Sequence, residues 1–275
     1  MHTLHKTPGP VSLAYESQGS GPLVVFLHGI GGNRTNWYGQ LDHFSDKFCA
    51  VTWDARGYGA SDDPPHALKF SDYADDLAHL LDHLKAERAH LVGLSMGGMI
   101  LQDFYNRYVK RVATLSLIDT SAGFGAASEE AKRDFLARRL EPLERGQTPK
   151  DIAPGVVQVL ASKHASPAVR EQLMASLSAL RVGPYKQALH AIVATDFRAM
   201  LSTIAVPTLV IVGDEDVVTP PAASEFLAKS ITGASLVRIP QAGHLTNIEK
   251  PQEFNAALRS FLEKYAQRAS VVSAS

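Results

Sequence analysis

The residue best suited to covalent chemistry is Ser95, which lies inside the run GLSMGG at 93–98. Glycines two residues before and two residues after the serine permit a sharp turn from a strand into a helix, which lifts the hydroxyl out of the sheet. Backbone N–H groups at the start of a helix then point at the position where an oxyanion would form. The pattern G-x-S-x-G also occurs by chance in glycine- and serine-rich turns, so its interpretation as a nucleophile depends on partner residues elsewhere.

A serine hydroxyl attacks a carbonyl carbon efficiently only when a base takes its proton. His244 is the candidate base, because it lies in a loop after the last expected strand, at the end of the sheet where open sheets place their sites. A carboxylate must in turn hold the imidazole in the right tautomer and stabilise its positive charge. Three aspartates follow buried strand-like segments and are candidates for this acid: Asp119, Asp214 and Asp216.

The elements that must position these residues alternate along the chain. Strand-like segments lie at 11–16, 22–27, 48–53, 89–94, 113–118, 208–212 and 236–239, and helix-like segments lie at 70–84, 96–108, 221–230 and 251–265. The first strand alternates apolar and polar residues as an edge strand does, and most of the others are the apolar runs of buried parallel strands. Ser71 is expected as a helix N-cap and Pro251 as a first-turn residue. This alternation predicts an α/β fold with a mostly parallel, doubly wound sheet.

One long region contains no strand-like segment. Residues 121–201 consist of amphipathic helical stretches separated by glycine and proline, which is too long for a simple crossover between two strands. We therefore expect a helical cap at 121–201, inserted into a core domain that comprises 1–120 and 202–268. The remaining residues, 269–275, are mostly small and polar and are expected to form a disordered tail.

Composition excludes several classes of protein. The chain of 275 residues is 45% hydrophobic and 20% charged, as globular proteins are. A net charge of −1 without a long basic block gives no reason to expect a nucleic-acid partner. The start lacks a signal-peptide pattern, no apolar run is long enough for a bilayer, and the single Cys49 rules out an intrachain disulfide. We expect a soluble, cytoplasmic protein with no membrane partner; its oligomeric state stays open.

Five motifs together resemble the α/β-hydrolase fold superfamily over nearly the whole chain. They are HGIGG at 28–32, DARGYGAS at 54–61, GLSMGG at 93–98, VGDEDVVTP at 212–220 and AGHLTNIEKP at 242–251. The resemblance implies an α/β-hydrolase fold with a helical cap insertion. Within the superfamily, GLSMGG, DTSAGFG at 119–125, ATDFR at 194–198 and GHLTNIE at 243–249 are similar to bacterial 3-oxoadipate enol-lactonases and related serine esterases.

The resemblance implies a catalytic triad of Ser95, Asp216 and His244, in the chain order of α/β-hydrolases. The family pattern of a glycine, two residues, an aspartate and soon a proline selects Asp216. Asp214 is then expected to be a turn residue that bonds its own loop, and Asp119 occupies a position that some relatives use for the acid.

The backbone N–H groups of Met96 and Ile30 are the expected oxyanion donors. Met96 follows the nucleophile directly, and Ile30 is selected by the resemblance of the HGIGG loop. The glycines of this loop let backbone approach a substrate closely, although they also fit a tight loop without a donor role. The resemblance further implies that His28 supports the loop and that the turn at 54–59 is structural.

The cap is expected to close a small, mostly apolar chamber above Ser95, which Trp37 either lines or supports from the core. The implied substrate is a small ester or enol-lactone with a carboxylate, as in the degradation of aromatic compounds. Arginine suits a carboxylate through its bidentate fork, and the resemblance selects Arg139, with Arg138 as the adjacent alternative. A second interpretation is that these arginines simply form the solvent-exposed face of a helix. The chain also has Leu136 close to where the family carries a tryptophan.

No cofactor motif is present. A Walker A lysine and the third glycine of a dinucleotide motif are missing, and no cluster of His, Cys and carboxylates has metal-ligand spacing. We therefore expect no metal and no organic cofactor. The predicted function is a carboxylic ester hydrolase that works through an acyl-enzyme. Three alternatives stay open: a C–C bond hydrolase, a cofactor-free haloperoxidase or perhydrolase on the same triad, and a non-catalytic small-ligand receptor.

Overall fold

A computed structural model describes residues 2–274 and places nine strands in one sheet. The strands lie in the order β1-β2-β4-β3-β5-β6-β7-β8, and β9 pairs with β3. Their bounds are β1 Leu4–Lys6, β2 Ala14–Gln18, β3 Ser20–Leu27, β4 Cys49–Trp53, β5 Ala89–Leu94, β6 Val112–Ile118, β7 Thr208–Gly213, β8 Ser235–Ile239 and β9 Val271–Ser273. The strands from β3 to β8 run parallel, so the predicted fold class is confirmed.

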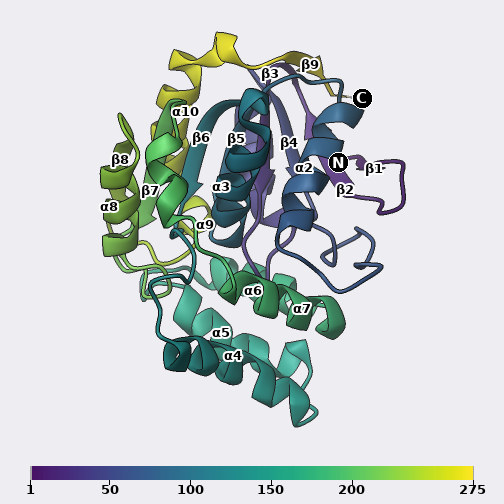
Figure 1. Cartoon of the computed structure of the whole chain (residues 1–275), viewed down its shortest axis with the longest axis vertical. Helices are drawn as coiled ribbons and strands as arrows, with labels where there is room; N and C mark the ends of the chain where they lie inside the picture. Colours follow the sequence, from purple (N-terminus) through teal and green to yellow (C-terminus); the bar gives the residue numbers. More distant parts are fainter. Residues whose placement is uncertain (1, 275) are drawn as a thin grey trace.

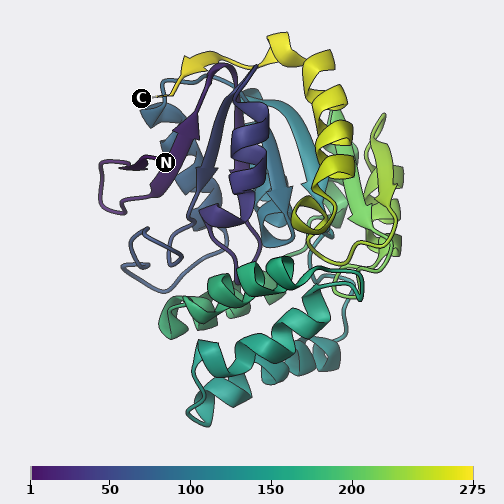
Figure 2. The same ribbon diagram turned by 180° about the vertical axis from the view of Figure 1, so that it is seen from behind.

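Helices cover both faces of the sheet, which explains why its central strands are mostly apolar, with a few buried polar residues such as His90 and Ser116. Figure 1 shows α2, α3 and α8 on one face, and Figure 2 shows α1 and α10 on the other. These helices and the short α9 span α1 Tyr38–Phe44, α2 Ser71–His83, α3 Met96–Tyr108, α8 Pro221–Ser230, α9 Thr246–Glu249 and α10 Pro251–Lys264. Each face has its own apolar cluster, with Leu77 and Leu101 in one, and Leu41 and Leu258 in the other.

A cap of four further helices lies below one end of the sheet in Figure 1, at the carboxyl ends of the parallel strands. The cap helices are α4 Glu129–Glu144, α5 Pro149–Leu160, α6 Pro167–Ser178 and α7 Val182–Val193, and they connect β6 to β7. Three of them begin with a hydroxyl side chain that accepts a backbone N–H in the first turn: Ser128, Thr148 and Ser166. α5 and α6 pack against each other, as do α4 and α7.

The C-terminal segment differs from the prediction of a disordered tail at 269–275. Residues 271–273 form β9, whose backbone pairs antiparallel with residues 20–22 of β3, and Ser270 N donates to Arg88 O at 2.9 Å. Val271 remains 79% exposed, whereas Val272 is partly buried against the core, so backbone pairing and the packing of one valine together hold this strand. Ser275 lies outside the described residues.

Two local predictions at the first strand and the second helix were wrong. The strand expected at 11–16 forms at Ala14–Gln18 and lies between β1 and β4, so β1 is the edge strand. Ser71 is not an N-cap, because Phe70 already has helical backbone angles; instead the Asp72 carboxylate accepts from Lys69 N at 3.1 Å. Pro251 begins α10 as expected. Within residues 2–274, no helix combines the length and the apolar character needed to cross a membrane.

Candidate active site

Ser95 lies at the sharp turn between β5 and α3. Its φ of 54° and ψ of −116° are rare for a residue with a side chain and indicate backbone strain at this position. The flanking glycines make the turn possible, because a Cβ on Gly93 would lie 2.5 Å from the backbone of Gly97, and one on Gly97 would clash with the Leu27 carbonyl. The turn presents the serine at the N-terminal end of a helix of thirteen residues.

His244 and Asp216 meet at the carboxyl ends of the neighbouring strands β7 and β8. The Nδ1 atom of His244 lies 2.8 Å from Oδ2 of Asp216. The carboxylate is itself fixed, since its Oδ1 accepts from the backbone N–H of Val218 and Thr219, and its Oδ2 accepts from the Thr219 hydroxyl. On the other side, His244 N donates to Leu160 O at the end of α5, at 2.8 Å. The core therefore holds the imidazole of His244, and the cap holds its backbone.

Electrostatics favour the charged forms of this pair. Burial opposes a charged imidazole, but the charge of Asp216 and the hydrogen bond to it raise the pKa of His244 above its ordinary value. Burial likewise opposes ionisation of Asp216, yet the charge of His244 and its hydrogen bond hold the pKa of that carboxyl below its usual range. Asp216 is thus suited to stabilise an imidazolium when one forms.

The other two aspartates face elsewhere. The Asp119 carboxylate accepts from Gly213 N with Oδ1, and from the Thr246 N–H and hydroxyl with Oδ2. Burial, followed by the charge of Asp216, raises the pKa of Asp119 to about 8. Contrary to expectation, the Asp214 side chain does not bond its own loop; its Oδ1 accepts from Arg238 Nε on β8 at 2.7 Å. Of the three candidates, Asp216 is the one in hydrogen-bond contact with His244.

The backbone N–H groups of Ile30 and Met96 lie near Ser95, and neither has an acceptor in the described part of the chain. Ile30 lies in the loop after β3, where a Cβ on Gly29 would lie 3.0 Å from the Cβ of Ser95. His28 supports this loop: Nδ1 lies 2.8 Å from Gly29 O, and Nε2 accepts from Ala55 N. This geometry requires neutral imidazole, in keeping with the pKa of His28, which burial lowers.

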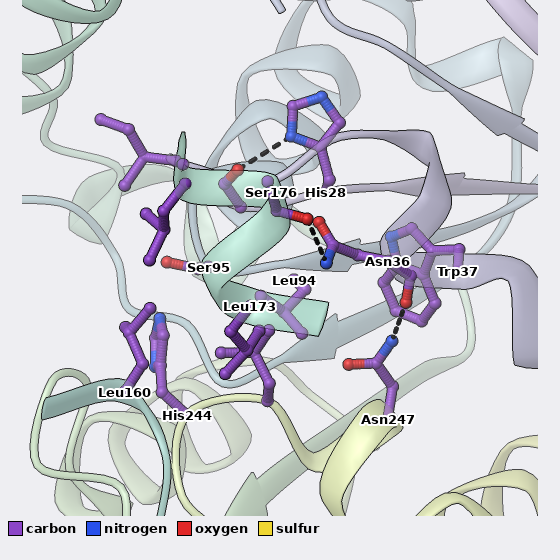
Figure 3. A pocket seen from close by; sticks show the side chains of 16 residues that line it. His28, Asn36, Trp37, Leu94, Ser95, Leu160, Leu173, Ser176, His244 and Asn247 are labelled. Atoms are coloured by element: carbon purple, nitrogen blue, oxygen red, sulfur yellow. Dashed lines mark hydrogen bonds between the residues drawn. The ribbon is translucent and has the colours of Figure 1, made fainter. Parts of the chain in front are cut away.

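Ser95 borders two cavities. The smaller, of about 30 Å³, lies between the 28–32 loop and α6 and is shown in Figure 3. The larger, of about 550 Å³, lies under α4, α5 and α7 and reaches the loop at 217–220. Residues that border both cavities are Ile30, Ser95, Leu160, Leu177 and His244. The Ser95 hydroxyl makes no hydrogen bond to His244 within the described residues; such contacts often tighten only when a substrate is bound.

The two expected substrate contacts lie in different cavities. Trp37 is fully buried, packs against Phe26 and Phe254, and borders the small cavity, so it belongs to both the core and the wall. Arg139 borders the large cavity, with its guanidinium 3.7 Å from the centroid of the Phe135 ring. Its one hydrogen bond in the structure goes to Phe135 O, and over residues 2–274 no carboxylate pairs with it. Burial lowers the pKa of Arg139.

Sequence reasoning missed the polar residues behind Trp37. Asn36, Ser176 and Asn247 are buried and line the small cavity, although they come from three distant segments. The capping box at Asn33 and Asn36 was a readable helix signal. No local pattern marks Asn247, because its partners are far away in the sequence.

Comparisons with known proteins identify the family and the fold. A family model described as alpha/beta hydrolase fold matches residues 22–251. The chain is 30% identical over 263 residues to 3-oxoadipate enol-lactonase 2 of Acinetobacter baylyi, covering 94% of this chain and 96% of that protein. A thermophilic esterase from Thermogutta terrifontis superposes with a TM-score of 0.87 at 32% identity, over 97% of this chain and 99% of the other. The enol-lactonase from Burkholderia xenovorans gives 0.85 at 27% identity, over 95% and 100%.

Proposed function

Because the chain belongs to the α/β-hydrolase fold family, we propose that it is a serine hydrolase that cleaves a small carboxylic ester or lactone through an acyl-enzyme on Ser95. The observation that carries the proposal is the hydrogen bond between His244 Nδ1 and Asp216 Oδ2, next to a cavity that Ser95 also borders. This bond places the ring proton on Nδ1 and leaves Nε2 as the nitrogen able to accept a proton.

The reaction then proceeds in two steps. The Ser95 oxygen attacks the acyl carbon while His244 Nε2 takes the hydroxyl proton, and the imidazolium returns it to the leaving alcohol or enol. Water attacks the acyl-enzyme by the same route and releases the acid. Asp216 stays ionised throughout, and the N–H groups of Ile30 and Met96 stabilise the negative oxygen of each tetrahedral intermediate. A ring-opened lactone stays attached until the second step.

The position of Arg139 supports the hypothesis that the substrate carries a carboxylate. Its guanidinium is partly buried in the cavity that also holds Ser95 and His244, and it has no carboxylate partner among the described residues. A substrate carboxylate would supply the missing counter-charge and bind the fork with two hydrogen bonds. The similarity to an enol-lactonase agrees with this assignment. We therefore propose small anionic esters and enol-lactones as the substrate class.

A labelling experiment with a turnover assay tests the proposal. A fluorophosphonate probe is expected to label the protein at Ser95, and nitrophenyl acetate to give a burst followed by steady turnover. Ser95→Ala is expected to abolish the labelling and to reduce turnover by about 10³-fold or more. An unlabelled protein that a small ester stabilises without turnover would support the receptor alternative instead. Preferential cleavage of a vinylogous diketone would support the C–C bond hydrolase.

A further inference from the structure

The side chain of Asn247 is a buried hydrogen-bond acceptor that faces the small cavity behind Ser95. Asn247 is 2% exposed, and its Oδ1 accepts from no donor among residues 2–274. A buried polar atom without a partner is costly, so its presence beside a cavity at a reactive serine points to a ligand. Figure 3 shows the amide nitrogen directed at Asn36 and the oxygen directed to the side where Leu173 lies.

The orientation of this amide is fixed by its neighbours. Gln40 Nε2 donates to Asn247 O at 3.0 Å and to Asn255 Oδ1 at 2.9 Å, which leaves Gln40 Oε1 as an acceptor. Asn247 Nδ2 donates to that Oε1 at 3.2 Å and to Asn36 O at 2.9 Å. Turning the Asn247 amide over would place its oxygen against two acceptors. The network therefore keeps the acceptor oxygen on the cavity side.

A hydrogen-bond donor lines the same cavity. The Ser176 oxygen accepts from Asn36 Nδ2 at 3.1 Å, and its own proton has no acceptor in the described chain. A ligand hydroxyl would satisfy both groups, because it donates one hydrogen bond and accepts others, whereas an ammonium group only donates. The other side chains of this wall are mostly apolar, including Leu94, Leu173 and Leu177.

The size of the cavity limits the group that enters it. A volume of about 30 Å³ corresponds to roughly two water-sized spheres of about 10–15 Å³ each. One or two heavy atoms beyond the acyl carbon therefore fill it. The large cavity on the other side of Ser95 is left for the remainder of the substrate.

We propose that the small cavity is an acyl subsite for short acyl groups that carry a hydroxyl, recognised by Asn247 and Ser176. The inference rests on the hydrolase function proposed above and narrows its substrate class. It concerns the acyl half of the substrate, so it is independent of the role of Arg139 in the large cavity.

Matched phenyl esters test the subsite. A glycolyl ester has the same number of heavy atoms as a propionyl ester, and 3-hydroxypropionyl matches butyryl. Each kcat/KM is divided by the rate constant for alkaline hydrolysis, which removes differences in intrinsic reactivity. The glycolyl ester, whose two heavy atoms beyond the acyl carbon match the cavity, is expected to be preferred about tenfold over the propionyl ester, as the loss of one buried hydrogen bond implies. The longer pair has three such atoms and should show a smaller preference. Equal normalised rates for the glycolyl and propionyl esters would overturn the inference while leaving the hydrolase function intact.

Variants assign the preference to the amide oxygen. Asn247→Leu is expected to abolish the preference, and Asn247→Ser, which adds no volume, serves if the leucine variant does not fold. Gln40→Leu removes one of the two acceptors that orient this amide but leaves the bond to Asn36 O, so the preference should weaken less than in Asn247→Leu. A preference that is unchanged in Asn247→Leu would overturn the inference. If the wild-type protein cleaves none of the four esters and takes no fluorophosphonate label, the hydrolase proposal itself fails.

Discussion

Oδ2 of Asp119 accepts two hydrogen bonds from Thr246, one from its backbone N–H at 3.1 Å and one from its hydroxyl at 2.7 Å. Thr246 lies two residues after His244, and Oδ1 of the same carboxylate accepts from Gly213 N at the end of β7. Asp119 thus joins the loop that carries the histidine to the strand that leads to Asp216. The geometry gives Asp119 a positioning role, whereas Asp216 contacts the imidazole itself.

The two aspartates are therefore expected to respond differently to amide substitution. Asp216→Asn should lower kcat by about 10³- to 10⁴-fold, because an amide does not hold the imidazole in the right tautomer or stabilise its charge. Asp119→Asn should lower kcat much less but cost about 1–3 kcal/mol in the free energy of unfolding, since its NH₂ group would face a buried donor. Steady-state kinetics and urea unfolding measure both effects. A larger loss of kcat for Asp119→Asn than for Asp216→Asn would identify Asp119 as the acid of the triad.

The pH dependence of kcat/KM should report the raised pKa of His244. A general base works only when neutral, so activity is expected to fall as the pH drops through a pKa above the ordinary 6.5 of an imidazole. The charge of Asp216 is the main cause that raises this pKa, whereas the pKa of Asp119 is itself raised to about 8, so its carboxyl is largely neutral where the limb falls. Asp119→Asn should therefore leave the acid limb close to its wild-type position. A profile measured from pH 5 to 9 checks both points, and a large shift of the limb in Asp119→Asn would contradict this assignment of charge.

Arg139→Ala should raise the KM of anionic substrates much more than the KM of neutral ones. For an enol-lactone with a carboxylate, KM is expected to rise by roughly 10- to 100-fold, because a buried charge-assisted pair is lost. For nitrophenyl acetate, which has no carboxylate, KM should change little. Arg138→Ala is the comparison variant on the same helix, because its side chain is more exposed although it borders the same cavity. A lactone response in Arg138→Ala but not in Arg139→Ala would assign the contact to Arg138.

The small cavity should limit the length of the acyl chain. Nitrophenyl acetate and propionate are expected to be cleaved better than hexanoate, and long-chain triglycerides poorly. Leu173→Ala removes a side chain that borders only the small cavity and should shift the preference toward hexanoate. Leu140→Ala removes a leucine of the same type that packs elsewhere in the cap, so it controls for loss of stability. An unchanged chain-length profile in Leu173→Ala would place the acyl chain in the large cavity.

The sequence reveals those parts of the molecule that depend on local chemistry. The turn at Ser95 was predictable because a positive φ and close backbone contact demand glycines at fixed positions. The strands were predictable because burial on both faces requires apolar runs. Their order in the sheet and the similarity to hydrolases confirm the fold class. The contact between Asp216 and His244 agrees with the triad interpretation, whose catalytic roles remain a prediction.

Features that depend on distant partners were not predictable. The polar tail gave no sign of β9, because that strand is held by backbone bonds to residues 20–22. Asp214 bonds Arg238, which lies on the adjacent strand β8. The direction of the Asn247 amide depends on Gln40 and Asn36, about two hundred residues earlier. In each case the residue types are ordinary, and only the three-dimensional arrangement distinguishes them.

The hydrogen bond from His244 N to Leu160 O ties the C-terminal end of α5 to the core, so α5 and α4 are expected to differ in how freely they move. Glu249 strengthens the link, since its carboxylate accepts from Ser162 N after α5 and from Gly243 N next to the histidine. The α5 end of the cap therefore cannot swing outward without withdrawing the base from the serine. In the described residues, no hydrogen bond or ion pair ties α4 to the sheet or its covering helices. We expect α4 to move outward to let substrates enter and products leave, while α5 keeps its hydrogen bonds to the core during turnover.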